Sequence, residues 1–247
     1  MSENVFGSTL SDGPELTVVI PVFCEAEHIA DVLETWRSTL DSLQIDYILC
    51  LYDDGSSDGT LEILERLARE HARIEVESRE NRGHGPTIRK GYERAHGRWV
   101  FQVDSDGEIA PDHFPALWTR RESYDLLLGC RHRCSPPPSR RLVTMMSRVT
   151  VRVLFGRGIR DVNSPYRLMR RSSLEALLPR IPVDAFAPNV ILSGLAIRDG
   201  LRVFEHEVPL QARASGRSSL AGRRLWRGAW RSFGDTLRVA LSTRHGS

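Results

Sequence analysis

Two acidic clusters in this chain of 247 residues combine residue types and spacing that could do chemistry. The first is Asp53-Asp54-Gly55-Ser56-Ser57-Asp58-Gly59-Thr60, and the second is Asp104-Ser105-Asp106. Each follows an apolar run, residues 47–52 and 99–103, that reads as a buried parallel strand. Carboxylates at the carboxyl ends of neighbouring parallel strands face the crevice where open α/β sheets bind ligands. An Asp-x-Asp pair there holds a hard divalent cation, so the clusters predict a site for a diphosphate-bearing ligand such as a nucleotide sugar.

Length and composition limit the class of protein. With 247 residues, 40% of them hydrophobic, the chain suits one large α/β domain or one domain with a small appendage. No apolar run approaches the roughly 18 to 20 residues of a membrane span. The polar, acidic segment 1–13 does not read as a secretory signal. We therefore expect a cytoplasmic protein.

Positive charge is concentrated in one segment, although the formal net charge of the chain is only +2. Residues 120–171 hold thirteen arginines against three acidic residues, which gives this segment a charge of +10. The guanidinium group of arginine can donate two parallel hydrogen bonds to the oxygens of a phosphate. The segment has no recognition motif and no series of aromatic residues for stacking bases. An anionic small ligand or a lipid head group is therefore the expected partner, and nucleic acid is not.

Strand and helix patterns alternate through the first half of the chain, which predicts a parallel sheet with right-handed crossovers. Asp58 or Thr60 is expected to cap the second helix. The glycine-rich turn 81–85 precedes the third helix. The predicted strands are residues 16–23, 47–52, 74–77 and 99–103, and the predicted helices are residues 27–43, 61–71 and 86–96.

The second half has a less regular pattern. The apolar segment 142–155, which Arg148 and Arg152 interrupt, is expected to pack on the core or to lie at an interface. The remaining predicted elements are a short helix at 111–118, a strand at 125–129, an extended loop at 135–139, helices at 174–178 and 189–199, and a final strand at 202–210.

The C-terminal segment, residues 220–247, reads as a basic amphipathic helix with a tail. Its apolar residues recur on one helical face: Trp226, Trp230, Phe233, Leu237 and Leu241. One interpretation is a helix that docks on its own domain. The alternative is a helix that binds an anionic membrane surface through its tryptophans and arginines.

Three further segments complete a pattern that resembles a known family. The segment Val18-Val19-Ile20-Pro21-Val22-Phe23-Cys24-Glu25 and the two acidic clusters are followed by Gly129-Cys130-Arg131, by Asp161-Val162-Asn163-Ser164-Pro165-Tyr166-Arg167-Leu168 and by Arg213-Ala214-Ser215-Gly216-Arg217-Ser218. In this order they resemble the inverting family 2 glycosyltransferases of GT-A fold, and the later segments resemble the branch of dolichol-phosphate mannose synthase and the bacterial polyprenyl-phosphate glycosyltransferases.

The resemblance implies an α/β fold of the GT-A type, with a mostly parallel central sheet flanked by helices. We expect this glycosyltransferase domain to occupy residues 15–219. A flexible N-terminus, residues 1–14, would precede it, and the C-terminal helix and tail would follow from residue 220.

By the same resemblance, several residues are expected to bind the nucleotide-sugar donor or its metal. The donor-binding residues would be Pro21, Glu25, Asp53, Asp54, Asp104 and Ser105. The residues that bind Mg²⁺ or Mn²⁺ would be Asp104, Asp106 and Glu108. Such an ion offsets the charge that grows on the departing nucleoside diphosphate.

The acceptor implied by the resemblance is a polyprenyl phosphate, whose phosphate is already an anionic nucleophile at neutral pH. The residues expected to bind it are Arg131, Arg167, Arg213, Arg217 and Ser218. Relatives commonly have a lysine in the last motif, whereas this chain has Gly216-Arg217-Ser218-Ser219, so Arg217 would have to replace that lysine. The residues expected to be catalytic are Asp106, Arg131 and Asp161.

Two other functions remain open on the sequence. An enzyme of the same fold could glycosylate a soluble hydroxyl acceptor, which would need a general base, and Asp161 and Glu108 are the candidates. A non-catalytic protein that binds nucleotide sugars is the other, although the intact Asp104 and Asp106 argue against it. Relatives often carry membrane spans, so we expect either peripheral contact with the cytoplasmic membrane face through the C-terminal helix or a membrane partner subunit.

Overall fold

All seven residues of the first strand, β1 (Leu16–Val22), are buried, because helices cover both faces of the sheet. Successive side chains of a strand point to opposite faces. Val18 and Ile20 accordingly pack in one core cluster with α1, and Val19 packs in a second cluster with α3. The predicted run of apolar residues therefore forms a central strand that contributes to two cores.

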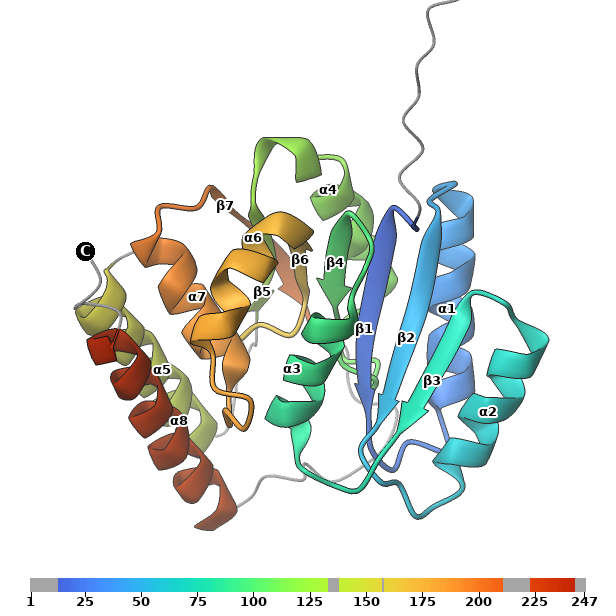
Figure 1. Cartoon of the computed structure of the whole chain (residues 1–247), viewed down its shortest axis with the longest axis horizontal. Coiled ribbons are helices and arrows are strands. Elements are labelled where there is room, and N and C mark those ends of the chain that lie inside the picture. Colours follow the sequence, from blue (N-terminus) through green and yellow to red (C-terminus); the bar gives the residue numbers. More distant parts are fainter. Residues whose placement is uncertain (1–12, 133–137, 157, 211–222, 243–247) are drawn as a thin grey trace, which may run out of the picture.

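The described residues form one seven-stranded sheet in the order β3-β2-β1-β4-β6-β5-β7 (Figure 1). The structure is a computed structural model that describes residues 13–132, 138–156, 158–210 and 223–242. Strand β6 is antiparallel to both of its neighbours, and the other pairs are parallel. The strands after β1 are β2 (Tyr47–Asp53), β3 (Ile74–Ser78), β4 (Trp99–Gln102), β5 (Leu126–His132), β6 (Arg167–Arg170) and β7 (Val203–Pro209).

Helices form a layer on each face of this sheet. Helices α1, α2 and α4 pack on one face, and α3 and α5 to α8 pack on the other. The α-helices are α1 (Ile29–Ser42), α2 (Thr60–Glu70), α3 (His84–Arg94), α4 (Phe114–Trp118), α5 (Pro138–Phe155), α6 (Arg171–Leu177), α7 (Pro188–Arg198) and α8 (Arg223–Ser242). The short 3-10 helices are η1 (Pro111–His113), η2 (Arg121–Ser123) and η3 (Leu178–Arg180).

The predicted α/β class with a mostly parallel sheet is confirmed, and three local predictions were wrong. Strand β6 was missed, because four residues with an arginine at each end show no apolar alternation. Helix α5 already begins at Pro138, inside the segment predicted to be a loop. The residue that precedes α2 is Gly59, in a left-handed conformation, and the Asp58 carboxylate accepts the Thr60 N–H next to it.

Helices α5 and α8 lie side by side at one end of the molecule (Figure 1). Helix α8 docks on α5 and α7 through small and apolar residues, since Gly228, Ser232, Thr236, Val239 and Ala240 are all buried. Of the two interpretations of the C-terminal helix, docking on its own domain is thus observed for residues 223–242. The expected domain boundary between residues 219 and 220 lies outside the described residues and stays a prediction.

Three residues of the apolar stripe expected on α8, Trp230, Phe233 and Leu241, face solvent rather than the core. Trp230 is 64% exposed, and its ring packs edge to face with that of Phe233. Helix α5 carries a second exposed stripe beside it. We call these exposed apolar residues the α5–α8 face: Leu142, Met145, Val149 and Val153 of α5, with Trp230, Phe233 and Leu241 of α8. Within the described part of the chain, no helix has the length and apolar character needed to cross a membrane.

Candidate active site

A cleft of about 1070 Å³ opens at the carboxyl ends of β1, β2 and β4, where the acidic clusters lie. Parallel strands β1, β2 and β4 are adjacent in the sheet, so the segments that follow them meet at one edge. Most of the predicted donor and metal residues line this cleft: Pro21, Glu25, Asp54, Asp104, Ser105 and Asp106. Arg131, at the end of β5, lines it as well. The sheet therefore assembles residues from four separate strands around one cavity.

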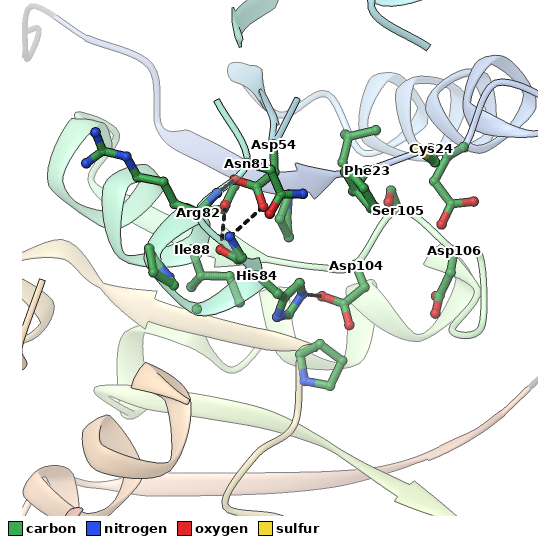
Figure 2. Close-up of a pocket in the computed structure, with 18 of the residues that line it drawn as sticks. Phe23, Cys24, Asp54, Asn81, Arg82, His84, Ile88, Asp104, Ser105 and Asp106 are labelled. Carbon is green, nitrogen blue, oxygen red and sulfur yellow. Dashed lines mark hydrogen bonds and ion pairs between the residues drawn. The ribbon is translucent and has the colours of Figure 1, made fainter. Parts of the chain in front are cut away.

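Asp54 holds the glycine-rich turn that forms one wall of the cleft. Its carboxylate accepts the backbone N–H groups of Arg82, at 3.0 Å, and Gly83, at 2.8 Å (Figure 2). Arg79 adds an ion pair at 3.5 Å. These contacts fix the start of α3 at the cleft, so Asp54 shapes the cleft as well as lining it.

Asp53 does not line the cleft, and its expected contact with the donor is wrong. The residue is 1% exposed, and its carboxylate accepts the Ser78 hydroxyl at 2.8 Å and the Ser56 N–H at 3.2 Å. Adjacent residues of an extended chain point to opposite sides. Only one of the two neighbouring aspartates can therefore face the ligand, and it is Asp54.

The carboxylates of Asp104 and Asp106 both project into the cleft (Figure 2). Asp104 Oδ1 contacts His84 Nε2 and the Gln102 side-chain amide, each at 3.0 Å. Burial would raise the pKa of Asp104, but the charge and hydrogen bond of His84, together with Arg131 and Gln102, lower it. Asp104 is therefore an anion ready to bind a cation.

Two carboxylates that face an open cleft suit a hard divalent cation, whose remaining ligands come from ligand oxygens and water. The expected third carboxylate, Glu108, does not line the cleft. Among the described residues, no group of three or more histidine, cysteine, aspartate or glutamate side chains is placed to hold a metal. The structure thus does not place Glu108 with Asp104 and Asp106 in the cleft, and its role as a third metal ligand stays a prediction. The carboxylates that fit a metal here are Asp104 and Asp106.

Arg131 is held by Asp161 in a bidentate ion pair. Nε lies 2.7 Å from Asp161 Oδ2, and Nη2 lies 3.0 Å from Oδ1. Burial would raise the pKa of Asp161, but the charge and hydrogen bonds of Arg131 lower it. Burial would lower the pKa of Arg131, whereas Asp161, Asp104 and Glu108 raise it. Arg131 is a fixed cation at the cleft, and Asp161 is the group that fixes it.

Arg167 cannot bind an acceptor phosphate in this structure. The residue is fully buried, and its guanidinium donates to the backbone carbonyls of Ser164, Asn189 and Val162. Burial lowers the pKa of Arg167. It links β6 to α7 inside the core. The other expected phosphate-binding residues, Arg213, Arg217 and Ser218, lie outside the described residues.

Three site residues were missed from the sequence: His84, Gln102 and Asn189. The glycine-rich turn that contains His84 is visible in the sequence, but the sequence does not indicate which carboxylate the histidine contacts. Gln102 and Asn189 lie within apolar elements and lacked any signal.

The comparisons with known proteins agree with this geometry. Residues 17–178 match the sequence profile described as glycosyl transferase family 2. The chain therefore belongs to that family, and the resemblance noted from its motifs is confirmed.

Curated relatives include two transferases of the same name. Undecaprenyl-phosphate 4-deoxy-4-formamido-L-arabinose transferase of Proteus mirabilis strain HI4320 is 30% identical over 214 residues, 85% of this chain and 64% of the relative. The transferase of that name from Pseudomonas fluorescens strain SBW25 is 27% identical over 213 residues, 85% of this chain and 61% of the relative. The chain thus spans just under two thirds of the length of these relatives.

Solved structures with the same fold include two glycosyltransferases. Glucosyl-3-phosphoglycerate synthase of Mycobacterium tuberculosis, in complex with Mn²⁺, UDP and phosphoglyceric acid, superposes with a TM-score of 0.70 at 21% identity and covers 92% of this chain and 79% of that one. A mannosyltransferase of Pyrobaculum calidifontis, in complex with GDP-mannose and Mn²⁺, has a TM-score of 0.62 at 19% identity and covers 95% of this chain and 65% of that one. The fold is therefore that of the GT-A glycosyltransferases.

Proposed function

We propose that this protein transfers a sugar, with inversion, from a nucleotide-sugar donor to a polyprenyl phosphate. The observation that carries the proposal is the pairing, in one cleft, of the Asp104 and Asp106 carboxylates with the fixed cation Arg131. The first group suits a metal-bound diphosphate and the second suits a phosphate. Family membership and relatives named as undecaprenyl-phosphate sugar transferases support the same reaction.

On the donor side, Asp104 and Asp106 would hold a divalent cation, Mg²⁺ or Mn²⁺. When bound, this ion would offset the charge that develops on the departing nucleoside diphosphate. Asp54 keeps the turn at residues 82–83 against the donor through its two short backbone hydrogen bonds. Pro21 and Glu25, from the end of β1 and the segment after it, line the same cleft.

On the acceptor side, an oxygen of the lipid phosphate forms a bond to the anomeric carbon as the bond from that carbon to the diphosphate breaks. A phosphate monoester with a second pKa of about 6 is already a nucleophile at pH 7, so this step needs no general base. Asp161, one of the two candidate bases for a hydroxyl acceptor, is poorly suited to that role, because Arg131 lowers its pKa and occupies both of its oxygens. Arg131 keeps Nη1 for the incoming phosphate, since among the described residues only Nε and Nη2 have acceptors.

A transfer assay separates this function from the alternatives. Purified protein with Mn²⁺ is offered radiolabelled UDP- and GDP-sugars, with short polyprenyl phosphates in one arm and soluble alcohols or saccharides in the other. We expect label to enter the organic phase only with the lipid phosphate. Label on a soluble hydroxyl would overturn the proposed acceptor, and donor binding without transfer to any acceptor would favour a binding protein.

We also propose that the α5–α8 face rests on the surface of an anionic membrane, where the lipid acceptor lies. Helices α5 and α8 carry nine arginines and one acidic residue, Asp235. The exposed Trp230 and the arginines beside it are the combination that binds such a surface. The neighbouring residue Arg231 lines the cleft and pairs with Asp184 at 3.1 Å. Helix α8 therefore borders the cleft in which the lipid phosphate would react.

Flotation with vesicles that contain an anionic phospholipid tests this contact. Replacing Arg227 and Arg238 by Gln should weaken binding roughly thirtyfold, since each basic residue contributes about 1 kcal/mol at such a surface. The matched control replaces Arg66 and Arg69 of α2, on the other side of the sheet, and should bind like wild type. Equal binding by both double variants, or no flotation of the wild type, would contradict the proposed contact.

A further inference from the structure

Three buried polar side chains, Gln102, Asn189 and Tyr92, form a hydrogen-bonded series that ends at the Asp104 carboxylate. Gln102 Nε2 donates to Asp104 Oδ1 at 3.0 Å. Asn189 Nδ2 donates to Gln102 Oε1 at 2.9 Å, and the Tyr92 hydroxyl donates to Asn189 Oδ1 at 2.7 Å. Gln102 is fully buried, and Tyr92 and Asn189 are each 3% exposed. This hydrogen-bonded series connects β4, α7 and α3 to the cleft.

The carboxylate of Asp104 sets the direction of every hydrogen bond in this series. A carboxylate only accepts, so Gln102 must present its NH₂ group to Asp104 and its oxygen to Asn189. Asn189 must then donate to Gln102, which leaves its own oxygen for the Tyr92 hydroxyl. Turning either amide around would place two donors or two acceptors face to face in the core, and such unpaired buried groups are costly. The three side chains therefore have one arrangement that satisfies all of them.

This arrangement selects which oxygen of Asp104 faces the ligand. Both contacts of Asp104, from Gln102 and from His84, fall on Oδ1. Oδ2 has no hydrogen-bond partner among the described residues. Asp104 follows β4 in a segment without regular structure, where a carboxylate would otherwise rotate. Gln102 is also neutral, so it holds Oδ1 without cancelling the negative charge that a cation requires.

We propose that Gln102, Asn189 and Tyr92 are positioning residues that orient the Asp104 carboxylate for the divalent cation of the donor complex. This inference rests on the proposed function, because it assumes that Asp104 is a metal ligand there. Outer residues of this kind, which hydrogen-bond a metal ligand, typically change metal affinity ten- to a hundredfold when they are replaced. Because these three residues lie on β4, α7 and α3, the orientation of Asp104 depends on how these elements pack together.

The test measures Mn²⁺ binding to the full chain directly, by the enhancement of water-proton relaxation during a titration with Mn²⁺ alone. Gln102→Met and Asn189→Leu should each weaken Mn²⁺ binding about ten- to a hundredfold. Tyr92→Phe, which keeps the shape of the side chain and removes only the last donor, should weaken it by a smaller factor in the same direction. The matched control is Ser193→Ala, which removes an equally buried hydrogen bond of α7, to the Val162 carbonyl at 2.8 Å.

Two comparisons separate the possible failures. If wild type and Asp104→Asn show the same Mn²⁺ binding, the metal site itself is wrong and the proposed function loses its donor-side argument. If wild type binds and Asp104→Asn does not, but the Gln102 and Tyr92 variants bind like wild type, only the positioning role is overturned. Thermal unfolding of each variant identifies any that misfolds. Weaker binding by a folded Tyr92→Phe variant, with Ser193→Ala unchanged, supports the proposal.

Discussion

Asp104 and Asp161 are both carboxylates whose pKa is lowered by a neighbouring cation, but the cations have different consequences. His84 touches one oxygen of Asp104 and leaves the other to the cleft. Arg131 takes both oxygens of Asp161. Asp104 thus keeps one oxygen for the proposed cation, whereas Asp161 holds Arg131 in place.

The Asp161–Arg131 pair predicts a pH dependence of stability. Because the pKa of Asp161 is lower in the folded protein than its ordinary value of 3.8, the pair stabilises the fold above that value and its contribution is lost as the pH falls below it. Asp161→Asn should lower the free energy of unfolding at pH 7 by about 3 kcal/mol, since it leaves Arg131 without its anion. Urea unfolding at pH 7 and at lower pH measures both effects.

The control for this prediction is Asp46→Asn, which changes an exposed carboxylate at the far end of the sheet. That variant should unfold like wild type. If Asp161→Asn lost no stability at pH 7, or lost the same amount at every pH, the ion pair would not be the support that we infer.

At the scale of elements, α8 packs closely against Phe186 at Gly228, where a larger side chain would clash. A Cβ on Gly228 would lie 2.3 Å from Cζ of Phe186, whereas a Cβ on Gly234 would have nothing within 4 Å. Gly228→Ala should therefore loosen the docking of α8 and lower the melting temperature. Gly234→Ala, on the same helix, should instead raise it slightly, because alanine is favoured over glycine in a helix by about 1 kcal/mol.

Thermal unfolding by circular dichroism measures the shifts of both glycine variants, and hydrogen exchange on α8 shows whether the helix has loosened. Equal behaviour of the two variants would contradict the close packing of Gly228 on Phe186. Since Phe186 lines the cleft, a loosened α8 should also alter that wall of the cleft.

The elements that could be predicted from the sequence are those with a strong period. Strands β1, β2 and β4 and helices α1 and α2 were predicted within one or two residues, because each is a buried run or an amphipathic repeat. Strand β6 was not predicted, since its sequence Arg-Leu-Met-Arg shows no alternation of apolar and polar residues and its ends are charged. Helix α8 was predicted, but its docking face was not. Tertiary packing selected Gly228 and Ser232 over the aromatic stripe, and helical periodicity alone does not distinguish these faces.

The site could be predicted only in part for a similar reason. The strand pattern placed Asp54, Asp104 and Asp106 at one edge of the sheet, and the family resemblance added Arg131; all four line the cleft. Spacing does not tell which of two adjacent aspartates faces a ligand, nor that Arg167 turns into the core. Those outcomes depend on hydrogen-bond partners from distant segments.

For the whole molecule, the sheet places the carboxylates of Asp104 and Asp106 beside Arg131, and α8 borders the same cleft, an arrangement in which the proposed soluble donor and lipid acceptor could meet. In this proposal, the carboxylates at the strand ends hold the divalent cation of the donor diphosphate, and the exposed α5–α8 face contacts the membrane. This account makes the divalent cation essential to transfer. It also makes Asp106, a carboxylate that lines the cleft, essential.

The most direct test is therefore the rate of sugar transfer to a short polyprenyl phosphate by wild type and Asp106→Asn, in excess EDTA and after Mn²⁺ is restored. We predict that wild type loses transfer in EDTA and regains it with Mn²⁺. The variant should stay folded but turn over at least about a hundredfold more slowly, the scale expected when a group that stabilises developing charge is removed. Undiminished transfer in EDTA, or a variant as fast as wild type, would contradict the account.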